Sequence, residues 1–399
     1  MTHRRMPSIL LSIYIALSAL SFFSCDLLTV APTESELTDT IDETTPRAPS
    51  IRNMSLGFQN SMVLREDGIL LASGSNNSAQ MGASDLPNRF DLGVIRIGVK
   101  NVFCGGTGAF FAMEDARLYV SGDNFFGQLG AGTNRYVTSR LISLGSGLEV
   151  RQIAFAGTAT LALDSQGSVW VTGENYEGTA RSSAGITPSG NVFQKLSETN
   201  YLDKVVAIAG SSKHSLFLLE DRTVWSCGTN TDGRLGTGDF IGDVAARQMN
   251  TITDAIAIAA GKTHSLVLTA DGDLYACGSN TDYQIGSGDA SMTQYPSPTR
   301  VMTKVVAIAA GDYSSYALTS DGELFVSGDN SSGQLGTGTL DDVNGFTSIL
   351  SGVSAIAAGP KHAYFLKSDG TLWGAGYNYF GQLGDCTTVD KKRPVRIYF

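Results

Sequence analysis

AIAIAAGKTHSLVLTADGDLYACGSNTDYQIG, at residues 255–286, is one copy of a pattern that occurs seven times in the chain. The copies align on a Gly-x-Asn triplet that follows a short apolar run. The first residues of the triplets are Gly74, Gly122, Gly173, Gly228, Gly278, Gly328 and Gly376. Self-similarity at a period of roughly 50 residues predicts a repeat architecture in which each copy forms one supersecondary unit.

Each copy contains the signals of short strands. The run VVAIAAG at 305–311 is a continuous series of β-branched residues and alanine before its glycine, as in a strand buried on both faces. Asp-Gly at 271–272 separates two further strand-like segments and is a strong hairpin signal. A fourth segment with proline and valine, at 296–302, leads into the next copy. Four strands per copy predict an all-β, seven-bladed β-propeller with four-stranded blades.

The two ends of the repeat region suggest how the ring closes. The first copy begins near residue 51 with no proline–valine strand before it, whereas the chain ends on such a segment, RPVRIYF at 393–399. We therefore expect the C-terminal strand to complete the first blade. This arrangement would remove the open sheet edges of an unclosed propeller.

The repeated pattern GxxHSLxLTxDGxLYxxGxNxxGQLGTG resembles the repeat of the regulator-of-chromosome-condensation family, over residues 51–399. The resemblance implies a seven-bladed propeller. It does not imply one function, because this architecture hosts nucleotide exchange factors, inhibitors and scaffolds. Guanine-nucleotide exchange is therefore one alternative function by family analogy, although an export signal would separate the chain from such a partner.

The N-terminus has the order of regions found in an export signal. Arg4 and Arg5 precede an apolar run at 9–23, and a small residue and Cys25 follow. This order predicts a signal peptide at 1–24, with an uncleaved anchor helix as the alternative. Cys25 after Phe-Phe-Ser resembles the lipobox of bacterial lipoproteins, which implies a diacylated thiol and a bacterial membrane anchor on the periplasmic or cell-surface side.

Residues 25–50 indicate how the domains are arranged, and the overall charge indicates which class of partner is excluded. The segment 26–50 is rich in Thr, Pro and acidic residues without periodicity, which predicts a disordered tether before the propeller at 51–399. The net charge of −10 argues against a nucleic-acid partner, which requires a basic footprint. We expect a monomer, and nothing in the sequence implies a cofactor.

Three histidines and two cysteines occupy recurrent positions. His214, His264 and His362 share one repeat position, where either a zinc site or a turn histidine bonded to the backbone could explain them. We expect the structural role and no metal.

Cys227 and Cys277 share a repeat position at which the other copies have small residues, so either packed free thiols or a disulfide is compatible with the spacing. No catalytic motif is present, and we expect a protein that is not an enzyme.

The copies differ most in the two residues after each triplet. In copies four to six these are Thr, Ser and Asp, whereas copies two, three and seven contain aromatic residues. The aromatic residues are Phe125, Phe126, Tyr176, Tyr379 and Phe380. The third copy also departs from the pattern in an extended loop at 182–200.

A one-sided set of exposed aromatic residues is typical of a binding surface. The sequence thus predicts a membrane-anchored, extracytoplasmic binding or scaffold propeller with a protein or glycan partner at the cell envelope. The alternative is an enzyme or an enzyme inhibitor that acts through the central channel face.

Overall fold

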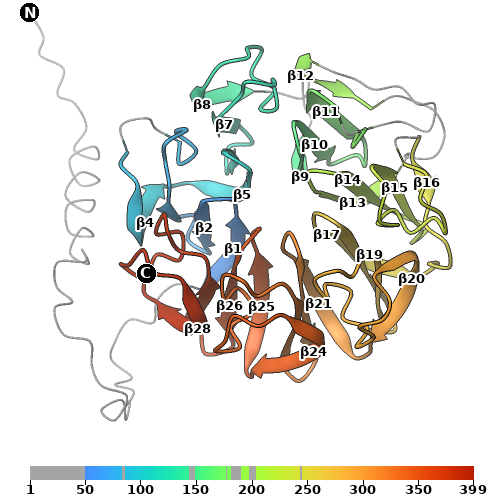
Figure 1. Ribbon diagram of the computed structural model, residues 1–399. Helices are drawn as coiled ribbons and strands as arrows, with labels where there is room; N and C mark the ends of the chain where they lie inside the picture. Colours follow the sequence, from blue (N-terminus) through green and yellow to red (C-terminus); the bar gives the residue numbers. More distant parts are fainter. Residues whose placement is uncertain are drawn as a thin grey trace, which may run out of the picture. The chain divides into compact units, whose positions relative to one another are not determined.

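The computed structural model describes residues 50–82, 86–142, 149–176, 178–180, 190–196, 204–242 and 245–399. These residues form seven four-stranded antiparallel sheets. Figure 1 shows the sheets arranged around a common centre, so the predicted seven-bladed β-propeller is confirmed. In these ranges no helix is long and apolar enough to cross a membrane. The predicted signal peptide, Cys25 and the tether up to residue 49 lie outside the described residues.

Each blade is one repeat, read from the centre outward. The innermost strands are β1 (Ile51–Leu56), β5 (Val99–Gly105), β9 (Val150–Ala156), β13 (Val205–Gly210), β17 (Ala255–Ala260), β21 (Val305–Ala310) and β25 (Val353–Ala358). The second strands are β2 (Asn60–Arg65), β6 (Gly108–Met113), β10 (Ala159–Asp164), β14 (His214–Leu219), β18 (His264–Thr269), β22 (Ser314–Thr319) and β26 (His362–Lys367). The third strands are β3 (Leu70–Gly74), β7 (Leu118–Gly122), β11 (Val169–Gly173), β15 (Val224–Gly228), β19 (Leu274–Ser279), β23 (Leu324–Gly328) and β27 (Leu372–Gly376). The outermost strands are β4 (Arg89–Arg96), β8 (Val137–Ile142), β12 (Gly190–Lys195), β16 (Arg247–Gln248), β20 (Gln294–Met302), β24 (Val343–Leu350) and β28 (Lys391–Ile397).

The antiparallel order places successive connections on alternate faces of the ring. The turn from first to second strand and the long loop from third to fourth strand share one face, where Ser279 N donates to Thr263 O at 2.9 Å. We call it the loop face. The hairpin from second to third strand and the link to the next blade share the other, where Val305 N donates to Gly272 O at 2.9 Å. We call it the hairpin face.

The ring closes differently from the prediction. The C-terminal strand β28 pairs with β27 inside blade 7, and blade 1 has its own fourth strand, β4, paired with β3. The expectation that the C-terminal strand completes the first blade is therefore wrong. The fourth strand of each repeat belongs to the third strand that precedes it, so the repeats at both ends are complete blades.

Side chains and loops join blade 7 to blade 1. Ser61 Oγ lies 2.8 Å from His362 Nε2, and Cys386 N donates to Phe90 O at 2.7 Å. A shared apolar cluster includes Leu71 of blade 1 and Leu383 of blade 7, both buried. Packing between blade faces thus closes the ring without a strand shared between its ends.

The core lies between neighbouring blades, because each sheet buries both of its faces. Leu266 and Leu274 of blade 5 pack in one cluster with Val305 and Ala317 of blade 6. The triplet glycine allows the third strand to approach the turn beside it. A Cβ on Gly278 would lie 2.4 Å from Thr263 O, at a φ of +116°.

Candidate functional site

The loops from third to fourth strand are folded by the asparagine of the Gly-x-Asn triplet. In blade 5, Asn280 Oδ1 accepts a hydrogen bond from Ile285 N at 3.2 Å, and Nδ2 donates to Met292 O at 2.9 Å. The same contact to the residue five positions on recurs at Asn124 and Asn378. One side chain thus satisfies both ends of a loop, which fixes the loop backbone locally.

Blade 3 keeps this contact although its sequence departs from the pattern. Asn175 Oδ1 accepts from Ala180 N at 3.0 Å. The predicted loop at 182–200 is wrong for residues 190–195, which form the outer strand β12. Arg181 and the remaining parts of that loop, apart from Leu196, lie outside the described residues.

A glutamine holds the aromatic positions of blades 2 and 7. Gln128 Oε1 accepts a hydrogen bond from Phe126 N at 2.9 Å, and Gln382 Oε1 accepts from Phe380 N at 3.1 Å. The conformation of each loop is therefore set before any ligand arrives. A preorganised aromatic side chain loses less conformational entropy on binding than one on a free loop.

Four aromatic rings form a cluster on the loop face of blades 2 and 3. Phe125 and Tyr176 are 57% and 72% exposed. Phe126 meets Tyr176 edge-to-face with ring centroids 6.3 Å apart, and Phe125 meets Tyr136 at 5.5 Å. We call Phe125, Phe126, Tyr136 and Tyr176 the aromatic cluster. Tyr136 was not predicted, because it lies ten residues or more beyond the triplet in a segment without a repeat pattern.

A cavity of about 640 Å³ lies beside this cluster. Phe126 and Tyr176 line it together with Asn134, Glu174 and Asn191. Asn191 Nδ2 donates to Asn134 Oδ1 at 2.9 Å across the boundary between blades 2 and 3. The site therefore combines aromatic faces with amide and carboxylate groups, a combination suited to hydrogen-bonding partners with apolar patches.

The aromatic residues of blade 7 form a separate group. Tyr379 is 66% exposed and lies 5.1 Å from Phe380, which is half-buried. Blade 1 separates this group from the aromatic cluster, and its corresponding turn carries Asn77 and Ser78. The five predicted residues are thus placed in two groups, three in the aromatic cluster and two on blade 7. Exposed Phe90 of blade 1 adjoins the blade 7 loop at Gly381.

The loops of blades 4 to 6 also expose apolar residues. Their two residues after the triplet are small and polar, but exposed apolar residues follow further along each loop. These residues are Phe240, Ile241, Met292 and Leu340. Apolar exposure alone therefore does not set the blades apart, and the loops of blades 2, 3 and 7 differ from these in the contacts between aromatic rings.

The repeated histidines join blades. His214 Nε2 lies 2.7 Å from Ser265 Oγ, and His264 Nε2 lies 3.0 Å from Ser315 Oγ of the next blade. The predicted backbone partner is wrong, since the partner is a serine side chain. Complete burial lowers the pKa of His264 to about 3. Among the residues that the structure describes, no group of three metal-ligating side chains is arranged to hold a metal.

The repeated cysteines do not form a disulfide. Cys227 and Cys277 are both buried and are not joined by a disulfide, so packed thiols are the correct alternative. Burial raises the pKa of Cys277 to about 12, so its thiol stays protonated. Both residues pack as small apolar groups at the blade seams.

A family model described as an RCC1-like domain matches residues 140–398, which is more than half of the chain. The chain belongs to the RCC1-like domain family. The ultraviolet-B receptor UVR8 of Arabidopsis thaliana is 27% identical over 204 residues, covering 50% of this chain and 46% of that protein. The X-linked retinitis pigmentosa GTPase regulator of Homo sapiens is 28% identical over 150 residues, covering 37% of this chain and 14% of that protein. The matched stretches thus span less than half of these relatives.

Solved structures share the RCC1-like fold. Yeast RCC1 (Prp20) bound to Kap60 superposes with a TM-score of 0.71 at 20% identity, covering 93% of this chain and 91% of that one. Prp20p from Saccharomyces cerevisiae gives 0.66 at 20% identity, covering 77% and 80%. At this identity the likeness shows the fold alone. An RCC1-like propeller suggests binding, scaffold or exchange-factor roles.

Proposed function

We propose that this RCC1-like propeller is a non-enzymatic binding module, anchored by a lipid on Cys25 to the extracytoplasmic side of a bacterial membrane. It recognises a protein or glycan partner at the cell envelope. The aromatic cluster of blades 2 and 3 and the adjoining cavity form the recognition site. The observation behind the proposal is the edge-to-face contact of exposed Phe126 and Tyr176 beside that cavity.

The chemistry of the cluster supports this role. Aromatic rings that stay exposed in the free protein lose unfavourable contact with water when a partner covers them. Asn134, Asn191 and Glu174 at the rim supply donors and acceptors that fix the orientation of the partner. A protein partner also has a precedent in the fold, since the structure of Prp20p is described together with its binding to Gsp1p and histones.

The test compares two sets of substitutions on the same face. The full-length chain in mild detergent serves as bait against envelope extracts and an immobilised glycan panel. The site variant is Phe125→Ser/Phe126→Ser/Tyr176→Ser. The matched control is Phe240→Ser/Ile241→Ser, which removes exposed apolar residues from the loop face of blade 4. Circular dichroism melting establishes that both variants are folded.

The proposal expects a partner that the parent and the control variant retain and the site variant loses. A partner held equally by all three proteins would move the site away from the aromatic cluster. Loss in both variants would show that capture reflects general exposed apolar surface, and the proposed site would be withdrawn.

A further inference from the structure

The second residue of each innermost strand is exposed in all seven blades. It is basic in blades 1 to 3, apolar in blades 4 to 6 and serine in blade 7. The residues are Arg52, Lys100, Arg151, Val206, Ile256, Val306 and Ser354. The third residue follows the same division, as Asn53, Asn101 and Gln152 in blades 1 to 3 and alanine in the others. The centre of the ring is therefore lined by a basic, amide-rich arc and an apolar arc.

A cavity of about 470 Å³ joins the two arcs. Four successive inner strands line it, with Arg52, Lys100, Arg151 and Val206 among the residues. It lies at the hairpin-face end of the channel, because these residues stand at the start of their strands. Its volume falls within the range of ~300–1,000 Å³ that is typical of ligand pockets.

The three basic residues differ in their partners. Arg52 forms ion pairs with Glu66 at 3.2 Å and Glu114 at 3.1 Å, and Lys100 pairs with Glu149. Arg151 has no hydrogen-bond or ion-pair partner among the described residues. Two of the charges are thus locally neutralised, whereas the guanidinium of Arg151 keeps all its donors available to a ligand.

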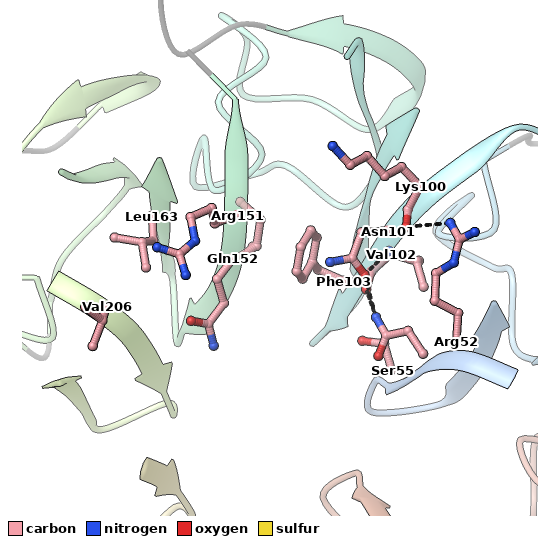
Figure 2. Close-up of a pocket in the computed structure, with 12 residues that line it drawn as sticks. Arg52, Ser55, Lys100, Asn101, Val102, Phe103, Arg151, Gln152, Leu163 and Val206 are labelled. Carbon is pink, nitrogen blue, oxygen red and sulfur yellow. Dashed lines mark hydrogen bonds between the residues drawn. The ribbon is translucent and has the colours of Figure 1, made fainter. Parts of the chain in front are cut away.

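Arg151 stands where the two arcs meet. Figure 2 shows its side chain extending towards Leu163 and Val206, away from Lys100. A guanidinium binds a carboxylate through two parallel hydrogen bonds. A ligand that contacts both Arg151 and Val206 therefore carries a carboxylate attached to an apolar group.

Two amide groups of the cavity indicate a peptide. Asn53 Nδ2 donates to Asn101 Oδ1 at 2.6 Å and to Val102 O at 3.1 Å. This arrangement leaves Asn53 Oδ1 as an acceptor and Asn101 Nδ2 as a donor without a partner in the described part of the chain. An acceptor and a donor side by side complement the N–H and C=O of a peptide group, which a fatty chain lacks.

We propose that this cavity binds the C-terminus of a peptide with apolar final residues. The terminal carboxylate pairs with Arg151, the last peptide group meets the amides of Asn53 and Asn101, and the apolar side chains contact Val206. The site lies on the hairpin face, so it does not depend on the function proposed for the aromatic cluster.

The test uses fluorescence anisotropy with the full-length chain. The probe is the peptide Gly-Ser-Gly-Val-Leu-Val, labelled with fluorescein at its N-terminus and ending in a free carboxylate. The comparison peptides are the same sequence with an amidated C-terminus, and Gly-Ser-Gly-Ser-Gly-Ser with a free carboxylate. We expect the free acid to bind at least tenfold more tightly than either.

Three variants locate the site. Arg151→Gln is expected to remove the preference for the free acid over the amide, and Val206→Thr to weaken binding about fourfold through loss of one methyl-sized apolar contact. Arg140→Gln, an exposed arginine on the outermost strand β8, serves as the matched control and is expected to leave binding unchanged.

Three results would overturn the proposal. The first is equal binding of the acid and the amide. The second is a preference for the acid that survives in Arg151→Gln, which would place the carboxylate elsewhere. The third is displacement of the peptide by octanoate at similar concentrations, which would assign the site to fatty carboxylates.

Discussion

At the scale of single residues, the buried histidines make the blade seams sensitive to acid. His214, His264 and His362 each contact a serine of the following blade, with blade 7 followed by blade 1. Burial lowers the pKa of His264 and of His362 to about 3, and that of His214 well below its ordinary value. The unfolded chain, with ordinary histidine pKa values near 6.5, therefore binds more protons than the folded chain between about pH 3 and 6.5.

We predict that the free energy of unfolding decreases as the pH falls through this window. Each histidine contributes about 1.4 kcal/mol per pH unit once the pH is well below about 6.5. His264→Gln removes the contribution of one histidine to the pH dependence of the free energy of unfolding. The variant is therefore expected to lose less stability than the parent between pH 7 and pH 5. Urea unfolding at pH 7, 6 and 5 measures this. A constant difference between the two proteins would show that His264 does not titrate on unfolding.

Glycine gives a second prediction at this scale, with a matched control in the same blade. Gly278→Ala is expected to destabilise the propeller by more than about 1–3 kcal/mol, because a Cβ there meets Thr263 O at 2.4 Å in a left-handed conformation. Gly288 also has positive φ, +75°, but open space around a built Cβ, so Gly288→Ala is expected to cost about 1 kcal/mol. Thermal and urea unfolding compare them. Equal losses of stability in the two variants would mean that positive φ alone, without the close approach to Thr263 O, explains why the triplet requires glycine.

At the scale of elements, inner strands were more predictable than outer ones. The inner three strands of each blade are short apolar segments that end at the Gly-x-Asn triplet, with an Asp-Gly turn between the second and third strands in four of the seven blades, and their pattern recurs in register. The outer strands face solvent and vary from the two residues of β16 to the nine of β20. With little buried surface to constrain them, their sequences diverge. The closure was misassigned because the fourth segment of each copy was read as leading into the next copy, whereas it pairs with the third strand before it.

The strand order gives a prediction that separates the two closures. Removing residues 391–399 deletes β28 and exposes the edge of β27. Hydrogen exchange of the amides in β27 is expected to accelerate, with β3 of blade 1 unchanged, because β4 still covers β3. The intact chain provides the reference. Faster exchange confined to blade 1 would favour the closure in which the C-terminal strand completes that blade.

The candidate sites show the same limit on sequence reasoning. The aromatic residues next to the triplet were predicted because they interrupt a regular pattern. Tyr136 was missed because its part of the loop carries no repeat pattern, and Asn134 and Asn191 were missed because a contact across a blade boundary leaves no local periodicity. The basic arc at the channel became visible only once the second residues of all inner strands were known to line one opening.

At the scale of the whole molecule, the lipid anchor would fix where the propeller works. Cys25→Ser is expected to shift the chain from the membrane to the soluble fraction, because it removes the thiol on which two acyl chains would anchor it stably. Fractionation and incorporation of a labelled fatty acid measure the effect. Cys104→Ser, at a free cysteine of the propeller, is the matched control. Membrane association that persists in Cys25→Ser without fatty-acid incorporation would favour an uncleaved anchor helix instead.

The two proposed sites lie on opposite faces of the ring, and this separation has a measurable consequence. The aromatic cluster is on loops between third and fourth strands, whereas Arg151 stands near the hairpin-face end of β9. Substitutions with no shared contacts have additive effects. We predict that Phe126→Ser leaves the affinity for the free-acid peptide unchanged, that Arg151→Gln leaves capture on the aromatic cluster unchanged, and that the double variant combines the two losses. Titrations of the four proteins with both ligands test this. A coupling of more than about threefold would mean that the seams between blades transmit binding from one face to the other, with the contacts between blades 2 and 3 as the first place to look.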